Sequence, residues 1–131
     1  MTTRRAFIAT TTLLTLSASK LANAMTTEKK QLVHHVFFWL KNPSSQADRD
    51  KLIQGLKTLA KIETVKSLHI GVPASTEKRD VVDSSYSVSE LMFFDSLDGQ
   101  STYQDHPIHK EFVKNHSMLW QKVVVYDSMG V

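Results

Sequence analysis

The stretch LVHHVFFWLK, residues 32–41, decides the fold of this chain. It is short, rich in β-branched and aromatic residues and followed by an Asn-Pro pair, which is typical of a β-strand. Alternation places His34 and Phe38 on one face of the strand and Phe37 and Trp39 on the other, so both faces carry apolar side chains. One layer of helices covers only one face of a sheet. The sequence therefore predicts that a second copy of the chain covers Phe37 and Trp39.

The segments that follow predict a regular order of strands and helices. A serine cap and leucines at helical spacing predict a helix over 45–60, and Gly55 inside it, which disfavours a helix by about 1 kcal/mol relative to alanine, indicates close packing. After it we expect a strand, a polar loop, a strand, a short helix, a further helix and a last strand, over 65–72, 73–85, 86–94, 97–104, 107–116 and 120–126. This βαββαβ order, with its second helix broken in two, predicts an α+β fold with a ferredoxin-like subunit.

The break in the second helix is set by Pro107. Proline suits the first position of a helix, and the residue before it is held in extended geometry, so one of the two residues before Pro107 is the expected cap. The new helix then presents His109 and Phe112 on one face, and Tyr103 closes the helix before it. A phenol and an imidazole are thereby expected at one place beneath the sheet.

Residues 1–24 predict an export signal. Arg4-Arg5 forms a twin-arginine start, a weakly apolar run follows, and Ala22-Asn23-Ala24 is a small-x-small cleavage pattern. The run is too short and too rich in threonine to span a bilayer stably, and the absence of cysteine excludes a lipoprotein anchor. We expect bacterial export to the periplasm or medium, by the twin-arginine or the Sec route, and one domain over 25–131 without a stable membrane anchor. An uncleaved anchor is the alternative.

The positive charge of the chain belongs to this leader. The net charge is +3, but residues 1–24 hold three of the 16 basic residues and none of the 13 acidic ones, which leaves 13 of each in 25–131. No basic excess remains for binding nucleic acid. A domain of this size without disulfides buries a modest share of its surface, which also favours a homodimer.

Tyr103 and His109 are the candidate acid–base pair. Imidazole titrates near neutral pH, and a phenol can hydrogen-bond an oxygen on which charge develops. His34, on the helix-facing side of the first strand, is the expected floor of the same cavity. The alternative is that Tyr103 and His109 only pack against each other beneath the sheet.

Glu90 is the least expected residue for this fold. Alternation places it with Val88 and Met92 on the core face of the third strand. A buried carboxylate must be paired, protonated or open to a water-filled cavity. We therefore expect Glu90, Phe38, Val88 and Met92 to contact a ligand; alternatively, a twist or bulge at the strand edge turns Glu90 to solvent.

Three histidines invite a metal interpretation. His106, His109 and His116 could share one stripe, but their spacing lacks the pattern of zinc motifs. We assign no metal site and expect no cofactor.

Several of these features together resemble the stress-responsive dimeric α/β-barrel (Dabb) family. They are His34 followed by Lys41 and Pro43, Gly71, Phe94-Asp95-Ser96 and, above all, Tyr103-x-x-His106-Pro107-x-His109-x-x-Phe112. The resemblance covers about residues 31–128. It implies a ferredoxin-like subunit that pairs sheet to sheet with a second copy to form a dimeric α/β barrel.

The resemblance also implies roles for individual residues. In a plant member, the cofactor-free olivetolic acid cyclase, the matching motif supplies a catalytic phenol and a base, which implies these roles for Tyr103 and His109 and a pocket position for His34. That enzyme has a further histidine in a Tyr-x-His pattern where this chain has Tyr86-Ser87-Val88. The polyketide activity itself is therefore not carried over.

Two classes of function follow. One is a small cofactor-independent lyase, cyclase or isomerase that uses a His–Tyr pair on a small, partly apolar molecule. The other is a non-catalytic dimeric stress-response or small-molecule-binding protein. A cavity lined by His34, Glu90, Tyr103 and His109 would favour the first.

Overall fold

The computed structural model describes residues 30–131, so the predicted export signal lies outside the described residues. Within this range the chain forms a βαββαβ order with a divided second helix, as the sequence predicts. The elements are β1 (Leu32–Leu40), α2 (Gln46–Thr58), a 3₁₀ turn (Leu59–Lys61), β2 (Ser67–Gly71), β3 (Val88–Phe94), α3 (Leu97–Asp105), α4 (Pro107–His116), a second 3₁₀ turn (Ser117–Leu119) and β4 (Trp120–Met129). In this part of the chain no helix is long and apolar enough to cross a membrane.

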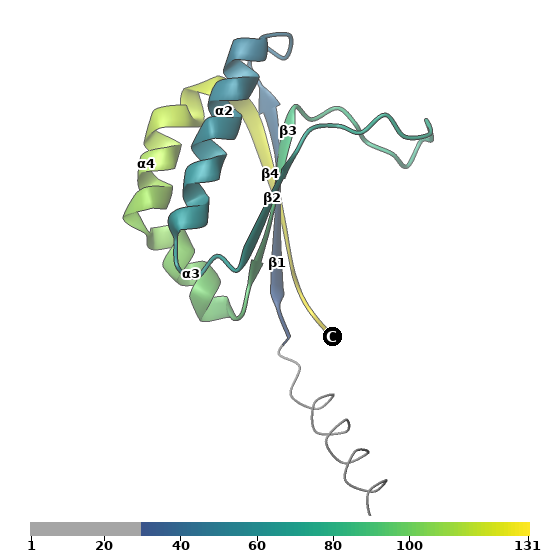
Figure 1. Cartoon of the computed structure of the whole chain (residues 1–131). Coiled ribbons are helices and arrows are strands. Elements are labelled where there is room, and N and C mark those ends of the chain that lie inside the picture. The colour runs from purple at the N-terminus through teal and green to yellow at the C-terminus, as the bar shows by residue number, and fades with distance from the viewer. Residues whose placement is uncertain (1–29) are drawn as a thin grey trace, which may run out of the picture.

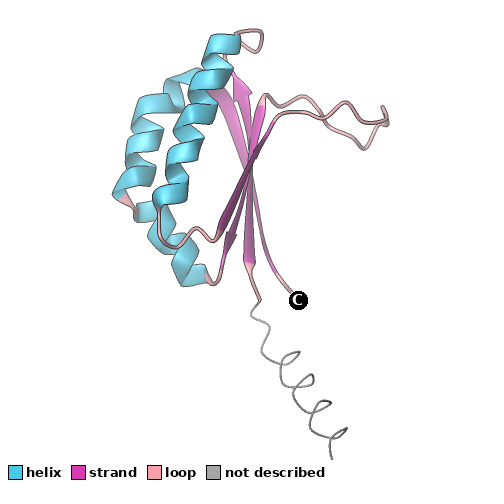
Figure 2. Cartoon of the chain, in the orientation of Figure 1, coloured by secondary structure: helices cyan, strands magenta, loops and turns pink. Residues whose placement is uncertain are grey.

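The four strands form one antiparallel sheet in the order β2-β3-β1-β4. The central strand is β1, which pairs with β3 on one side and β4 on the other. The helices α2, α3 and α4 all lie on one side of this sheet (Figures 1 and 2). The sheet is thus covered by helices on a single face.

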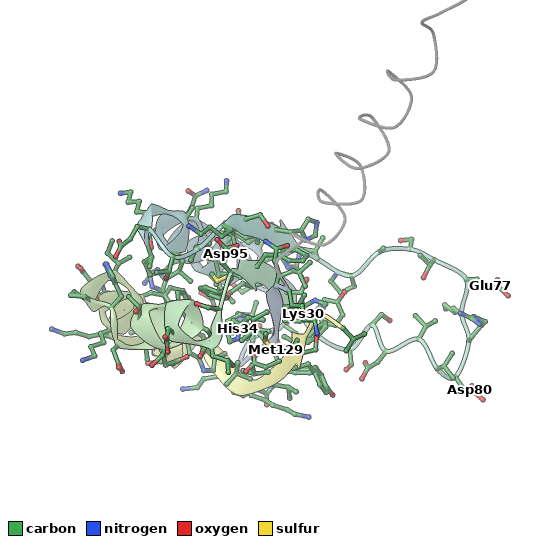
Figure 3. All side chains as sticks on the ribbon, turned by 90° about the horizontal axis from the view of Figure 1, so that it is seen from below. Lys30, His34, Glu77, Asp80, Asp95 and Met129 are labelled. Atoms are coloured by element: carbon green, nitrogen blue, oxygen red, sulfur yellow. The ribbon has the colours of Figure 1, made fainter. Side chains whose placement is uncertain are left out.

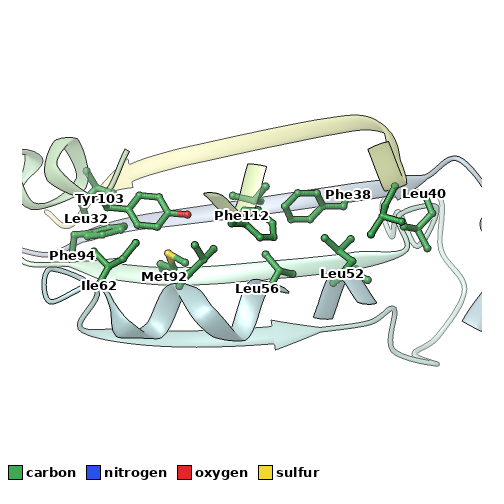
Figure 4. Close-up of a cluster of buried hydrophobic side chains, with 14 residues drawn as sticks. Leu32, Phe38, Leu40, Leu52, Leu56, Ile62, Met92, Phe94, Tyr103 and Phe112 are labelled. Atoms are coloured by element: carbon green, nitrogen blue, oxygen red, sulfur yellow. The ribbon is translucent and has the colours of Figure 1, made fainter. Parts of the chain in front are cut away.

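Alternate residues of β1 are buried beneath the helices. The buried residues are Leu32, His34, Val36, Phe38 and Leu40, and the residues that alternate with them are only partly buried. The core that they join contains Leu52 and Leu56 from α2, Phe94 from β3 and Phe112 from α4 (Figure 4). These side chains fill the space between the sheet and the helices, which is what fixes the position of α3 and α4.

The opposite side of the sheet, which we call the open face, carries no helix in the described part of the chain (Figure 1). It is nevertheless rich in aromatic groups, because the Phe37 ring contacts the rings of His35, Tyr86 and Tyr126 with centroids 4.3, 4.9 and 6.1 Å apart. Tyr126 is 65% exposed. The remaining apolar residues of the open face are Val33, Trp39, Leu91, Phe93 and Val124. An apolar sheet face of this kind indicates an interaction surface.

The loop between β2 and β3, residues 72–87, forms an arm. It extends from the sheet on the side of the open face (Figures 1 and 2), and Glu77 and Asp80 mark its outer end, away from the helices (Figure 3). Trp39 Nε1 donates a hydrogen bond of 3.0 Å to Ser85 Oγ, which ties the base of the arm to β1.

The helix caps follow the sequence closely. Ser45 Oγ accepts a hydrogen bond of 3.1 Å from the Asp48 backbone N–H at the start of α2. At the break between α3 and α4, His106 is the cap, because its Nδ1 accepts a hydrogen bond of 3.1 Å from the Ile108 backbone N–H while Pro107 takes the first helical position. Sequence alone leaves the choice between Asp105 and His106 open, and the structure selects His106.

The last strand is longer than predicted. It runs from Trp120 to Met129, three residues beyond the predicted end at Tyr126. The extension pairs with the start of β1, where Asp127 lies opposite His34. Asp127 and Ser128 are polar residues with low strand propensity, but pairing with β1 holds them in the sheet.

Gly55 has a specific structural reason. A Cβ atom added there would lie 2.5 Å from Nε2 of His116, on α4. The His116 ring is stacked on Phe112 with centroids 5.1 Å apart, and its Nδ1 is 2.9 Å from the Phe112 carbonyl oxygen. Because Gly55 has no side chain, the His116 ring of α4 can pack directly against the backbone of α2.

This packing predicts that the effect of Gly55→Ala depends on His116. In the parent protein the new methyl group displaces the imidazole, and we expect a loss of about 1 kcal/mol in the free energy of unfolding after the gain in helix propensity is included. In a His116→Ala background the clash is absent, so the same substitution should stabilise by about 1 kcal/mol. Urea unfolding of the four proteins measures this coupling. Equal effects of Gly55→Ala in both backgrounds would contradict it.

Candidate active site

A cavity of about 250 Å³ lies between the sheet and the two halves of the broken helix. Four residues predicted from the sequence line it together: His34, Glu90, Tyr103 and His109. The other lining residues are Val36, Phe38, Gln104, Phe112, Val113, Trp120, Val123 and Val125. The walls are thus mainly apolar, with the polar groups contributed by a few side chains, which is typical of a small-molecule site.

Two predicted ligand-contacting residues do not line this cavity. These are Val88 and Met92, which are fully buried in the core, whereas Phe38 lines the cavity as predicted. They lie on the predicted face of β3, but in a part of it that contacts α2 and belongs to the core, and Figure 4 shows Met92 among the core side chains. Alternation identifies the face of a strand and not the helix that covers each part of it.

Glu90 is buried, with 1% of its surface exposed. The alternative in which a bulge turns it to solvent is therefore wrong, because β3 pairs in regular register with β1 and β2 on both sides of it. Burial raises the pKa of Glu90 from an ordinary value of 4.5 to about 8, and the hydrogen bond from Tyr103 acts in the opposite direction. Glu90 is thus mainly a neutral carboxylic acid at pH 7.

Tyr103 joins α3 to this carboxyl group. Its hydroxyl donates a hydrogen bond of 3.4 Å to Glu90 Oε1, and Figure 4 shows the hydroxyl pointing along the buried face of the sheet toward Phe112. Burial, followed by the neighbouring Glu90, raises the pKa of Tyr103. The phenol therefore acts as a hydrogen-bond donor and not as a phenolate base.

His109 extends from the first turn of α4 against Tyr103, with ring centroids 4.7 Å apart. Its partial burial lowers its pKa most, and the neighbouring His34 adds to this, whereas a hydrogen bond involving the Gln104 backbone acts in the other direction. At neutral pH the ring is thus held neutral. A neutral imidazole carries its proton on one nitrogen and leaves the other free to accept a proton.

His34 is paired with a residue that the sequence analysis missed. Its Nδ1 lies 2.6 Å from Oδ1 of Asp127, and the imidazole is buried whereas the carboxylate is 47% exposed. The carboxylate orients the ring, so Nε2 is the nitrogen left for a ligand. The antiparallel register of β1 and β4 places the two residues opposite each other. The length of β4 is the feature that brings Asp127 to the site, because the strand continues past Tyr126.

The cavity is reached from the β4 side of the sheet. Val123 and Val125, which line it, are 43% and 45% exposed. The opposite end is closed by the core around Phe94 and Met92. A ligand would enter past the two valines with its apolar part toward Phe112 and Trp120 and its polar part toward Tyr103.

The three histidines considered for a metal lie in different surroundings. His106 caps α4, His109 packs on Tyr103 and His116 stacks on Phe112 against Gly55. Within residues 30–131 no group of three or more His, Cys, Asp or Glu residues is arranged to hold a metal ion.

Comparison with known proteins places the chain in a family. Residues 32–129 match the model of the stress responsive A/B barrel domain (Dabb), and the chain belongs to this family. It is 30% identical over 79 residues to a stress-response A/B barrel domain-containing protein of Arabidopsis thaliana, a match that covers 60% of this chain and 69% of that protein.

Solved structures show the same ferredoxin-like fold. One is a dimeric ferredoxin-like protein of unknown function from Thermobifida fusca, with a TM-score of 0.62, 19% identity and coverage of 79% of this chain and 93% of that one. Another is a hydroxynitrile lyase from Passiflora edulis, with a TM-score of 0.66, 22% identity and coverage of 78% and 94%. At this identity the likeness concerns the fold alone.

Proposed function

We propose that this Dabb-family protein is a cofactor-independent lyase, cyclase or isomerase acting on a small, partly apolar molecule. The observation that carries this proposal is the cavity in which a neutral His109 lies against Tyr103, with His34 and Glu90 in the same walls. Filling of the site by Phe38, Phe94 and Met92 would have favoured a non-catalytic protein, but an open cavity of about 250 Å³ remains beside them.

In this proposal the two rings have separate roles. His109 accepts a proton from the ligand through its free nitrogen, because it is neutral at neutral pH. Tyr103 donates a hydrogen bond to the oxygen on which negative charge develops. His34, oriented by Asp127, holds the ligand on the floor of the cavity. The cavity is slightly below the range of about 300–1,000 Å³ typical of drug-sized ligands, which favours a small molecule.

The first experiment is a ligand screen by thermal shift, followed by turnover assays on every ligand found. Small carbonyl compounds and small hydroxynitriles are the appropriate panel, the latter because the Passiflora edulis protein with this fold is a hydroxynitrile lyase. Compounds that stabilise the protein and are converted would support an enzyme. Compounds that stabilise it without conversion would favour the binding protein.

We expect His109→Ala to lower turnover by about 100-fold or more, because a positioned general base contributes about 10²- to 10⁴-fold. The free energy of unfolding should change by no more than about 2 kcal/mol, since the ring is only half-buried and borders a cavity. His106→Ala is the matched control: it removes an imidazole from the start of the same helix and weakens a cap, but leaves the cavity unchanged. Equal losses of activity in the two variants would contradict the assignment.

We also propose that the protein is a homodimer joined through the open face. Solved relatives of the same fold include proteins described as dimeric. The aromatic side chains around Phe37 need a second layer to remove them from water, and a second copy supplies an identical apolar face.

We further propose that the protein is exported and that the exported form begins near Met25. The twin-arginine start and the Ala22-Asn23-Ala24 pattern support this proposal. Mass spectrometry of the protein recovered from the periplasm or the medium should give a first residue near Met25. Recovery of a form that still contains Arg4 and Arg5 would show that the signal is not cleaved there.

A further inference from the structure

Glu90 is a buried acid that has no role yet in the proposed reaction, in which His109 is the base and Tyr103 the hydrogen-bond donor. It is 1% exposed, and among the described residues none of the ion pairs includes it. Tyr103 from α3 is its hydrogen-bond partner, Ile70 from β2 lies beside it, and α2 contributes leucines to the core. His34 and His109 share the cavity that Glu90 lines, but neither forms an ion pair with it. An unpaired carboxylate in such surroundings takes up a proton.

A neutral carboxyl group at this position has one oxygen to spare. Oε1 accepts the hydrogen bond from the Tyr103 hydroxyl, at a long 3.4 Å. The proton of the neutral form then resides on Oε2, and Glu90 lines the cavity. Because the bond from Tyr103 to Oε1 is long, a ligand oxygen that carries more negative charge takes the single phenol proton in its place, while the Oε2–H of Glu90 is a second donor in the same mainly apolar cavity.

We propose that Glu90 and Tyr103 together bind the oxygen of a carbonyl ligand, and stabilise it as an enolate, by donating two hydrogen bonds. A phenol beside a protonated carboxylic acid is a known oxyanion-binding arrangement, for which ketosteroid isomerase is the established example. The inference rests on the proposed function and narrows it: the substrate class is a small carbonyl compound with an acidic C–H next to the carbonyl group.

The reaction step that this arrangement serves is balanced without any further reagent. The free nitrogen of His109 takes the proton from the α-carbon, the C–H electron pair becomes the new C=C bond, and the carbonyl π pair moves to the oxygen held by Tyr103 and Glu90. The resulting imidazolium then returns its proton to another carbon or to the oxygen of the intermediate. No group is oxidised or reduced.

The test uses 4-nitrophenol, whose ionised form resembles an enolate and absorbs visible light. Binding of the phenolate to the parent protein is followed by absorbance from pH 7 to 10. We expect the affinity to fall by about tenfold per pH unit above pH 8, where Glu90 loses its proton and repels the anion. Glu90→Gln keeps a donor that does not titrate, so its affinity at pH 7 should stay within about threefold and should not fall in this way.

Glu90→Leu removes the donor while keeping an apolar side chain, and should weaken binding at pH 7 by about tenfold or more, since a hydrogen bond to a charged group is worth that much. The three proteins differ at position 90 alone, so the comparison isolates the Glu90 side chain. Unchanged binding by Glu90→Leu, a fall above pH 8 that persists in Glu90→Gln, or a parent protein that binds no phenolate would each overturn the inference. If binding is lost in His109→Ala but unchanged in Glu90→Leu, the donor pair is wrong whereas the proposed function stands.

Discussion

Replacing Phe37 with aspartate is expected to convert the protein from a dimer into a monomer. Phe37 lies at the centre of the open face, in contact with His35, Tyr86 and Tyr126. A hollow of about 130 Å³ beside it is bordered by Trp39, Tyr86, Tyr126 and Asp83. A carboxylate placed there would be buried without a partner in both subunits, which costs several kcal/mol.

We therefore expect the dissociation constant of the dimer to rise by about 1,000-fold or more, which analytical ultracentrifugation at micromolar concentration can measure. Leu97→Asp is the matched control, because it introduces the same charge at an exposed leucine on the helical side. That variant should remain dimeric. Circular dichroism should show that the Phe37→Asp monomer stays folded, since Phe37 is only partly buried within one subunit. A parent protein that is monomeric, or a Phe37→Asp protein that is dimeric, would refute the proposed interface.

The strand β1, which carries Phe37, shows why much of the fold could be predicted from the sequence. The alternation in β1 identified both of its apolar faces, and Pro107 fixed the division between α3 and α4 to the residue. These are local rules of backbone geometry, which act on neighbouring residues and need no knowledge of the tertiary structure. The reason for Gly55 could not be predicted in this way, because it depends on His116, which approaches from another helix.

The candidate site was predicted less completely for the same reason. His34, Tyr103 and His109 meet at the cavity as their positions on the strand and the broken helix suggested. Asp127 was missed because its partner lies 93 residues away in the chain and is found only through the register of β4. Val88 and Met92 were placed at the site because alternation alone cannot reveal that the core fills their part of the sheet face. Contacts between distant elements decide which residues of a correct face reach the ligand.

Glu90→Gln is expected to stabilise the protein at pH 7 by about 3 kcal/mol. The folded protein holds the pKa of Glu90 at about 8, above its ordinary 4.5, so between these values the folded state binds a proton that the unfolded state has lost. Stability is therefore full below about pH 4.5, falls by about 1.4 kcal/mol for each pH unit up to about pH 8, and does not change further above it on account of this group. Glutamine remains neutral throughout and escapes this loss.

The measurement is the difference in free energy of unfolding between Glu90→Gln and the parent protein, from pH 5 to pH 9 at one protein concentration. It should be small at pH 5 and rise to about 5 kcal/mol above pH 8. Glu111→Gln, at an exposed glutamate of α4, should show no such rise. A constant difference for Glu90→Gln would mean that the carboxyl group is ionised in the folded protein. In that case Glu90 could not donate a hydrogen bond to a ligand. A difference that rises with pH would show that the folded protein keeps Glu90 neutral at the wall of the cavity, although this acid destabilises the fold at neutral pH. A neutral carboxyl group is the form that donates a hydrogen bond.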